Sequence, residues 1–282
     1  MKIAVASGKG GTGKTTISTN LALYVAGQGY DTVYFDCDVE EPNGHLFLKP
    51  VITKKEASSI PVPVIDELKC CACGECVRFC EYKALVRLGK SMMVFSELCH
   101  GCGGCALVCP DHAIQEQERE IGFIETGQSG KVGFVHGRMN IGEAMSPPLI
   151  RDVLQQIPNK EVNIIDAPPG TSCPVIASIR DTDFVVLVTE PTPFGLNDLG
   201  LALDMIRELG IPHGVVVNRA EDGNRDAECF CEKRQVEILA QIADDRRIAE
   251  CYSKGELILK GVPGVEKRFE ELWQAIRKRL MA

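Results

Sequence analysis

The sequence has no long apolar run and no recognisable export signal. Its first six residues carry a single basic side chain and run into glycines before an apolar segment of secretory length can form. No later stretch approaches the ~18–20 apolar residues that a membrane-spanning helix requires. We therefore expect a cytoplasmic protein with no stable membrane insertion.

The sequence also lacks an excess of positive charge. Lysine and arginine number 31 against 39 acidic residues, which gives a formal net charge of -8. Proteins that bind nucleic acid use clustered Lys and Arg side chains to displace counterions from the phosphate backbone. We expect no nucleic-acid partner.

What the sequence does have is the composition of an ordinary folded chain, together with many cysteines. Apolar residues make up 45% and charged residues 25% of 282 residues, enough for one large or two smaller domains. The 14 cysteines would suggest disulfides in a short secreted chain. Without an export signal they are better read as metal ligands or free thiols.

The hydrophobic pattern outside the middle of the chain predicts alternating strands and helices. An apolar strand at 3–6 is followed by a glycine-rich loop, a helical segment at 17–25 and a second strand at 32–35. Runs of β-branched residues recur at 162–165, 184–188 and 215–217, each followed by a polar loop. This order predicts an α/β fold with a mostly parallel sheet, with ligands at the carboxyl ends of its strands.

Residues 61–118 differ from the rest in their dense cysteines and short segments, and they begin with Pro61-Val62-Pro63. We interpret them as an inserted domain within a discontinuous domain made of residues 1–60 and 119–282. Apolar alternation around the Gly127–Gly130 cluster predicts a β-ribbon at 121–135.

The glycine-rich loop matches the phosphate-binding pattern G-x-x-x-x-G-K-[ST], and it lies between a strand and a helix as that pattern demands. Backbone N–H groups of such a loop and the helix N-terminus surround phosphates. Lys14 is expected to contact the β- and γ-phosphates of ATP, and Thr15 to bind Mg²⁺. The candidate nucleotide-binding residues in the loop are Gly8, Lys9, Gly10, Gly11, Thr12, Gly13, Lys14, Thr15 and Thr16.

With Lys9, the loop resembles that of the deviant Walker A ATPases, a family that includes MinD, ParA, Mrp and the nitrogenase iron protein. The resemblance implies a P-loop NTPase fold in which two subunits enclose ATP. It implies a homodimer on ATP binding, with Lys9 reaching the nucleotide of the partner chain.

Three further segments extend this resemblance. Asp36-Cys37-Asp38 is similar to the second acidic motif of the family, in which Asp38 would orient the attacking water or a Mg²⁺-bound water, supported by Asp36. Residues 166–171 resemble its Walker B and switch II, where Asp166 would hold Mg²⁺ through water and Gly170 would offer an N–H group to the γ-phosphate. Asn218 and Arg219 resemble its adenine-binding end. The resemblance implies a Mg²⁺-dependent ATPase whose catalytic residues are Lys9, Lys14, Asp38 and Asp166.

The inserted segment contains the run C-x2-C-x2-C-x3-C twice, the spacing of bacterial ferredoxins that bind two [4Fe–4S] clusters. In that arrangement the fourth cysteine of each run binds the other cluster. One cluster is expected on Cys70, Cys73, Cys76 and Cys109, and the other on Cys99, Cys102, Cys105 and Cys80, in an α+β ferredoxin-like module. Two zinc knuckles are the alternative.

Other cysteines leave open whether a further metal is bound. Cys173 follows the 166–171 segment, and Cys229 and Cys231 form a C-x-C pair in a polar segment expected to be a loop. The C-terminal apolar stripe at 265–280 has helical spacing. Acidic residues interleave it, which favours a core-packing helix over a membrane anchor like that of MinD.

We expect an ATP-gated electron-transfer protein that passes electrons to an unidentified redox partner protein. Two alternatives remain open: a carrier of iron–sulfur clusters of the Mrp type, and a positioning ATPase whose clusters sense redox state. The eight cysteine ligands favour electron transfer, because a carrier must release its cargo.

Overall fold

The computed structural model describes residues 1–156 and 160–281. Its contacts divide the chain into two compact units. The sheet unit comprises Met1–Lys55, Ile124–Arg138 and Ile150–Ala282, and the cysteine unit comprises Glu56–Phe123 and Met139–Leu149. Residues 139–149 therefore belong with the cysteine unit, which nothing in the sequence indicated.

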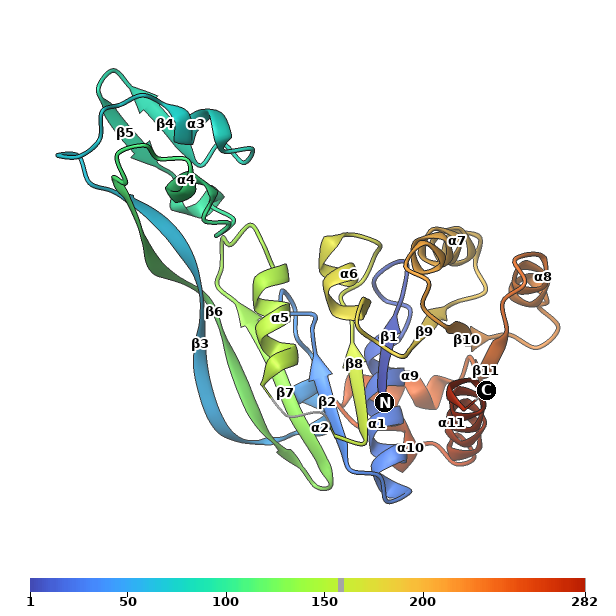
Figure 1. Ribbon diagram of the computed structural model, residues 1–282. Coiled ribbons are helices and arrows are strands. Elements are labelled where there is room, and N and C mark those ends of the chain that lie inside the picture. Colours follow the sequence, from blue (N-terminus) through green and yellow to red (C-terminus); the bar gives the residue numbers. More distant parts are fainter. Residues whose placement is uncertain (157–159, 282) are drawn as a thin grey trace. The chain divides into compact units, whose positions relative to one another are not determined.

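Within the described residues, nine strands form one sheet, in the order β11-β10-β9-β1-β8-β2-β7-β6-β3 (Figure 1). The pairings from β7 to β11 across the centre are all parallel. The strands of this central part are β1 (Lys2–Ala6), β2 (Thr32–Asp36), β7 (Val132–Met139), β8 (Val162–Asp166), β9 (Phe184–Thr189), β10 (His213–Ala220) and β11 (Ile238–Ala243). The α/β fold with a mostly parallel sheet is confirmed.

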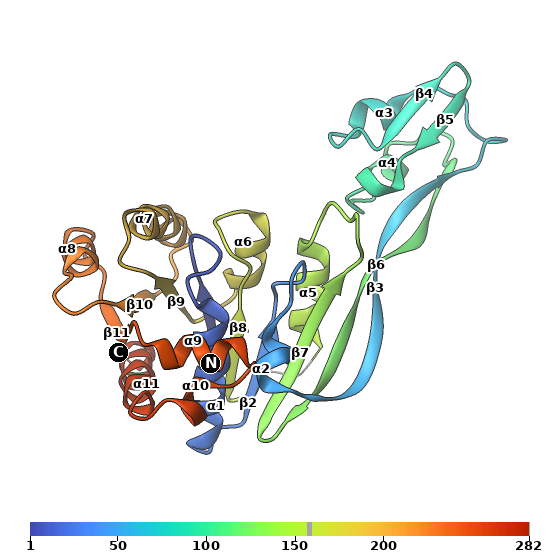
Figure 2. The ribbon, with the colours of Figure 1, turned by 180° about the vertical axis from the view of Figure 1, so that it is seen from behind.

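Helices cover both faces of the central strands (Figures 1 and 2). On one face, α1 (Lys14–Gly27), α10 (Ile258–Gly261) and α11 (Glu266–Leu280) bury Leu21, Phe269 and Trp273 in a shared apolar core. On the other face, α6 (Cys173–Ile179) contacts β1, and α7 (Pro193–Glu208) contacts β9. The remaining helices of this part are α2 (Gly44–Leu48), α5 (Pro147–Gln155), α8 (Asp226–Lys233) and α9 (Arg246–Ser253).

Parallel pairing brings the polar strand ends to one edge of the sheet. Asp36 at the end of β2 is the register partner of Asp166 at the end of β8, and Val5 of β1 is the partner of Asp166 on the other side. The loops after β1, β2, β8, β9, β10 and β11 all leave from this edge, which is where ligands bind in such sheets.

The cysteine unit has little regular structure of its own. It contains α3 (Glu75–Phe79), the antiparallel pair β4 (Leu85–Leu88) and β5 (Ser91–Val94), the 3₁₀ turn η1 (Ser96–Leu98) and α4 (Gly104–Leu107). Residues 56–65 of β3 (Val51–Ile65), residues 114–123 of β6 (Ile114–Ser129) and residues 139–149 also belong to this unit. One cluster of buried apolar residues in it consists of Cys76, Leu85, Cys105 and Ile114.

Pro61 and Pro63 lie inside β3, the edge strand of the sheet, where a residue without an N–H donor is tolerated. One local expectation was wrong. Cys229 and Cys231 lie in α8, a regular helix, and not in a loop.

The interpretation of the C-terminal stripe is confirmed. Phe269, Leu272, Trp273 and Ile276 of α11 are at most 1% exposed and belong to the main apolar core. Among the described helices, none combines the length and the apolar character needed to cross a membrane.

Candidate functional site

The glycine-rich loop between β1 and α1 is braced from β10. Gly13 has a φ of 91°, a conformation that favours glycine, and a Cβ there would lie 2.2 Å from the Asn218 side-chain nitrogen. That nitrogen donates to the Thr12 carbonyl oxygen at 2.8 Å. Asn218 therefore holds the loop in shape, a role that its place in the sequence did not indicate.

A cavity of about 410 Å³ opens beside this loop, a size typical of small-molecule sites. It gathers residues from the loops after β1, β2, β8 and β11, from β10 and from α9. Its lining includes Gly10, Gly11, Gly13, Lys14, Thr15, Thr16, Asp38, Pro169, Asn218, Arg219, Asp244, Asp245, Ile248 and Tyr252. The loop, the second acidic motif and the Asn218-Arg219 pair thus meet in one place.

The residues from β11 and α9 in this lining were not identified from the sequence. Asp244 and Asp245 follow β11, and Ile248 and Tyr252 lie on α9. The available signal was the strand at 238–243 that ends in two aspartates, the same strand-then-acid pattern seen at Asp36 and Asp166.

Lys14 is buried among carboxylates. Its ammonium donates to Asp166 Oδ1 at 2.8 Å and lies 3.9 Å from Asp38 Oδ2. Burial alone would lower the pKa of Lys14, but Asp166 and Asp38 outweigh it, so the pKa is raised and the amine stays charged. These contacts bring together three of the four predicted catalytic residues.

Asp36 has a structural role beside them. It is fully buried, and its carboxyl group accepts hydrogen bonds from the backbone N–H groups of Gly44 at 2.8 Å and Asp38 at 3.2 Å. Burial, followed by the charge of Asp166, raises the pKa of Asp36 to about 8. Burial raises the pKa of Asp38 to about 6, against the effect of Lys14. Asp36 thus fixes the start of α2 and the backbone of Asp38.

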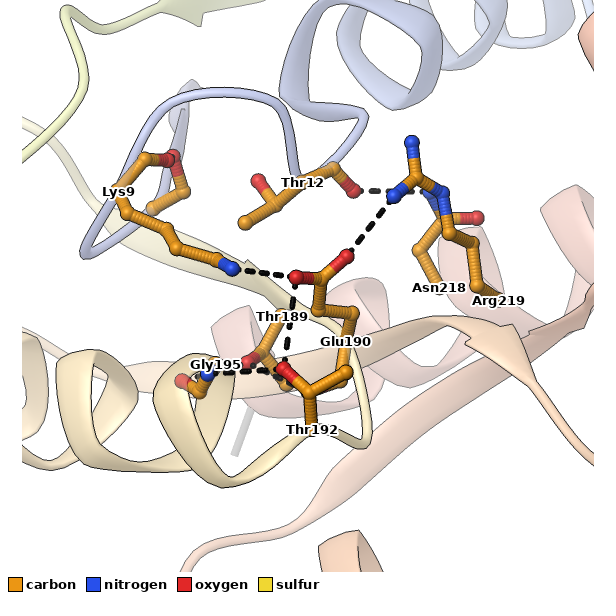
Figure 3. Close-up of polar contacts among 9 residues, drawn as sticks. Lys9, Thr12, Thr189, Glu190, Thr192, Gly195, Asn218 and Arg219 are labelled. Carbon is orange, nitrogen blue, oxygen red and sulfur yellow. Dashed lines mark hydrogen bonds and ion pairs between the residues drawn. The ribbon is translucent and has the colours of Figure 1, made fainter.

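Lys9 is held within its own chain by Glu190, which follows β9 (Figure 3). The Glu190 carboxylate binds the Lys9 ammonium and, through its other oxygen, the Arg219 guanidinium at 2.9 Å. Hydrogen bonding from Lys9 is the main reason that the pKa of Glu190 lies below its ordinary value. Thr192 also donates to this carboxylate and caps α7 by accepting from the Gly195 N–H group. Nothing in the sequence marked Glu190 as a site residue.

Gly170 is placed differently from its expected role. Its N–H group donates to the Ser7 carbonyl oxygen at 2.9 Å, so it would have to leave this bond to reach a phosphate.

A match over most of the chain shows which family it belongs to. Residues 3–258 match the model of the CobQ/CobB/MinD/ParA nucleotide binding domain. The chain belongs to this family. It is therefore a P-loop nucleotide-binding protein, and the match spans both sides of the cysteine-rich segment.

Individual relatives agree with this assignment. The chain is 33% identical over 265 residues to an uncharacterized protein of Methanocaldococcus jannaschii, covering 92% of each chain. It is 25% identical over 285 residues to an iron-sulfur cluster carrier protein of Aquifex aeolicus, covering 94% of this chain and 63% of the relative. The cell division ATPase MinD of Pyrococcus furiosus has the same fold, with a TM-score of 0.62, 21% identity and 98% coverage of both chains.

The eight cysteines of the two runs lie in two separate groups in the cysteine unit. Cys70, Cys73, Cys76 and Cys109 line one cavity, which is a tight cleft of about 10 Å³ that Cys71 also borders. Cys80, Cys99, Cys102 and Cys105 line another, of about 280 Å³. Each group takes its fourth cysteine from the other run.

The remaining candidate cysteines do not gather. Cys173 is exposed at the start of α6, and along α8 Cys229 is exposed while Cys231 is buried. In the described part of the chain, no three His, Cys, Asp or Glu side chains are arranged to hold a single metal ion. A four-iron cluster separates its thiolates more widely than one ion does, so a single-ion geometry is not expected of the two cysteine groups.

Proposed function

We propose that this protein is a Mg²⁺-dependent ATPase that forms a homodimer on binding ATP and uses two [4Fe–4S] clusters to transfer electrons to a partner protein. The observation that carries the proposal is the crossed grouping of the eight cysteines. Three thiols of one run and the last thiol of the other lie together, twice. Bacterial two-cluster ferredoxins distribute their ligands in this way, whereas zinc sites pair C-x2-C units.

The packing of the cysteine unit also supports bound clusters. The apolar cluster at the cysteines has four buried members, and two of them are the ligand candidates Cys76 and Cys105. Small units with so small a cluster usually need metals or disulfides for stability. Metal–thiolate bonds can replace a missing core, because binding free energy then contributes to folding.

Backbone N–H groups already point at the cysteine sulfurs. Gly101 donates to Cys99 Sγ at 3.4 Å, and Ala113 donates to Cys109 Sγ at 3.3 Å. Such bonds stabilise thiolate charge and are one of the ways in which proteins tune iron–sulfur potentials. When bound, the clusters would supply one-electron redox chemistry. The first group encloses about 10 Å³ and would have to widen to hold one.

At the nucleotide site, Lys14, Thr15 and Asp38 line the cavity, and the fully buried Asp166 contacts Lys14. Lys14 is charged and can exchange Asp166 for the phosphates of ATP. Thr15, Asp38 and Asp166 provide the hard oxygen donors that suit Mg²⁺ and its bound water. Lys9 can reach a partner's nucleotide only after its ion pair with Glu190 opens.

The test is the metal content of protein purified without oxygen. We expect about eight iron atoms and about eight acid-labile sulfides per chain, as two [4Fe–4S] clusters require. Cys105→Ser should lose about half of the iron, since it removes one ligand of the second group. Cys251→Ser, at a buried cysteine in α9 of the sheet unit, is the control and should keep all of it. Zinc in place of iron, without broad visible absorption, would contradict the proposal.

A second candidate is a carrier of iron–sulfur clusters, favoured by the similarity to the Aquifex aeolicus protein of that name. The two functions differ in how firmly iron is held. Incubation with an apo-ferredoxin should leave the iron on an electron-transfer protein, whereas a carrier would pass it to the acceptor.

A further inference from the structure

A buried tyrosine outside every motif contacts the carboxylate of Asp166. Tyr34 lies in β2, is fully buried and stacks on Phe134 of β7 with ring centroids 5.9 Å apart. Its hydroxyl donates to Asp166 Oδ2 at 2.9 Å. An apolar side chain would pack in this strand equally well, so the hydroxyl is what calls for an explanation.

The two oxygens of Asp166 have different partners. Oδ1 accepts from Lys14 at 2.8 Å, and Oδ2 accepts from Tyr34. Lys14 has a second task at the phosphates, so its contact with Oδ1 is exchangeable. Tyr34 lies in a strand, so its contact with Oδ2 is not one that the phosphates can replace.

The surroundings of the hydroxyl fix its position. Gly44, the first residue of α2, packs so closely that a Cβ there would lie 2.4 Å from the Tyr34 oxygen. The hydroxyl lies between Gly44 and Asp166 and donates its hydrogen to Asp166 Oδ2.

We propose that Tyr34 is a positioning residue for Asp166, whose hydroxyl holds Oδ2 so that Oδ1 is presented to Mg²⁺-bound water once Lys14 turns to the phosphates. The inference rests on the proposed Mg²⁺-dependent nucleotide site. It predicts that Tyr34 affects the magnesium requirement of nucleotide binding and leaves the magnesium-free affinity for nucleotide unchanged.

The test is Tyr34→Phe, which deletes one oxygen and keeps the ring. Binding of a fluorescent ATP analogue is followed during a Mg²⁺ titration and again in EDTA. We expect the half-saturating Mg²⁺ concentration to rise about tenfold, since a buried carboxylate oxygen loses its donor. The affinity in EDTA should stay within about twofold, because no phosphate contact is removed.

Two controls separate positioning from stability. Tyr30→Phe makes the same chemical change beside Trp273, and its Mg²⁺ requirement should equal that of the wild type. If Tyr34→Phe cannot be recovered folded, Gly44→Ala displaces the hydroxyl without deleting it and should raise the Mg²⁺ requirement in the same direction.

The outcomes are distinct. A lowered melting temperature with an unchanged Mg²⁺ requirement in Tyr34→Phe, or an unchanged requirement in Gly44→Ala, would overturn the role of Tyr34. Wild-type protein that binds the analogue equally with and without Mg²⁺ would instead overturn the proposed nucleotide site itself.

Discussion

At the scale of single residues, the site is governed by buried charge. Lys14, Asp36 and Asp166 are all at least nine-tenths buried, and only one of them carries positive charge. One cation cannot neutralise two buried carboxylates and Asp38, so the surplus negative charge must be removed by protonation or compensated by hydrogen bonds. Burial, followed by the charge of Asp166, raises the pKa of Asp36 to about 8, so a proton on Asp36 relieves part of this surplus.

This arrangement predicts a pH dependence of stability. The pKa of Asp36 is about 8, above its ordinary value, so between about pH 4 and pH 8 the folded chain binds more protons than the unfolded one. The contribution of Asp36 to stability is therefore fully present at low pH, below its ordinary pKa, and is lost as pH rises through 8. For one proton the free energy of unfolding should fall by up to ~1.4 kcal/mol per pH unit.

The measurement is urea unfolding from pH 5.5 to pH 8 in EDTA and without nucleotide. Asp36→Asn should flatten the slope at a cost in stability, because the amide loses one of the two accepted hydrogen bonds. A stability in the wild type that increases over this range would contradict the assignment.

At the scale of elements, the loops after neighbouring strands hold one another across the cavity. The loop after β9 binds the loop after β1 through Glu190 and Lys9, and β10 joins it through Arg219 (Figure 3). Lys9 is 30% exposed and the Glu190 side chain 11%, so the pair is accessible to competition. Lys9 would leave Glu190 only if the phosphates of a partner's nucleotide bound its ammonium more tightly than the Glu190 carboxylate does.

We therefore predict that Glu190→Gln promotes the ATP-dependent dimer. A partly exposed ion pair is worth up to ~1 kcal/mol, and the homodimer opens two of them, so the dimer should form at up to about thirtyfold lower protein concentration. Sedimentation velocity with a non-hydrolysable ATP analogue measures this. Glu237→Gln removes an exposed ion pair with Arg279 on the same unit and should have no effect.

Lys9→Ala separates the two assumptions in this prediction. It should bind nucleotide and remain monomeric. A Lys9→Ala dimer would refute the role of Lys9 in the partner's site, whereas a dimer of Glu190→Gln no tighter than the wild type would refute only the competition by Glu190.

At the scale of the whole molecule, the two units are joined by continuous strands. Both β3 and β6 begin in one unit and end in the other. Strand β6 is followed by β7, which pairs with β2, and β2 leads directly to Asp38. A nucleotide-dependent change at Asp38 therefore has a route through paired backbone into the strands that lead to the cysteines.

We predict that ATP binding and cluster redox state are coupled. Linkage makes the effect reciprocal: ATP shifts the reduction potential, and reduction shifts the affinity for ATP. Allosteric coupling of ~1–3 kcal/mol is common and corresponds to tens of millivolts or more for one electron.

The measurement is a redox titration followed by EPR without nucleotide, with Mg·ADP and with a non-hydrolysable ATP analogue. Lys14→Ala loses the charge that contacts the phosphates and should not hydrolyse ATP. Nucleotide should therefore shift the reduction potential least in this variant. Equal potentials in all three wild-type states, with equal nucleotide affinities for oxidised and reduced protein, would remove the basis for ATP-gated electron transfer.

Local patterns were sufficient wherever the chemistry is contiguous in the sequence. The phosphate-binding loop at 8–16 and the two cysteine runs each have fixed spacing, and the alternation of apolar strands and polar loops was enough to predict a parallel sheet with its ligands at one edge. The spacing of the cysteine runs even predicted which thiol crosses to the other group, because known ferredoxins share that spacing.

Contacts between segments far apart in the sequence were decided only by the tertiary structure. Tyr34 and Asp166 are 132 residues apart, and Lys9 and Glu190 are 181 apart. Tyr34 reads in the sequence as one more β-propensity residue, and Glu190 as one more acidic loop residue. Their roles arise because parallel pairing brings strand ends from the whole chain to one edge, where a buried carboxylate or an exposed lysine must find a partner.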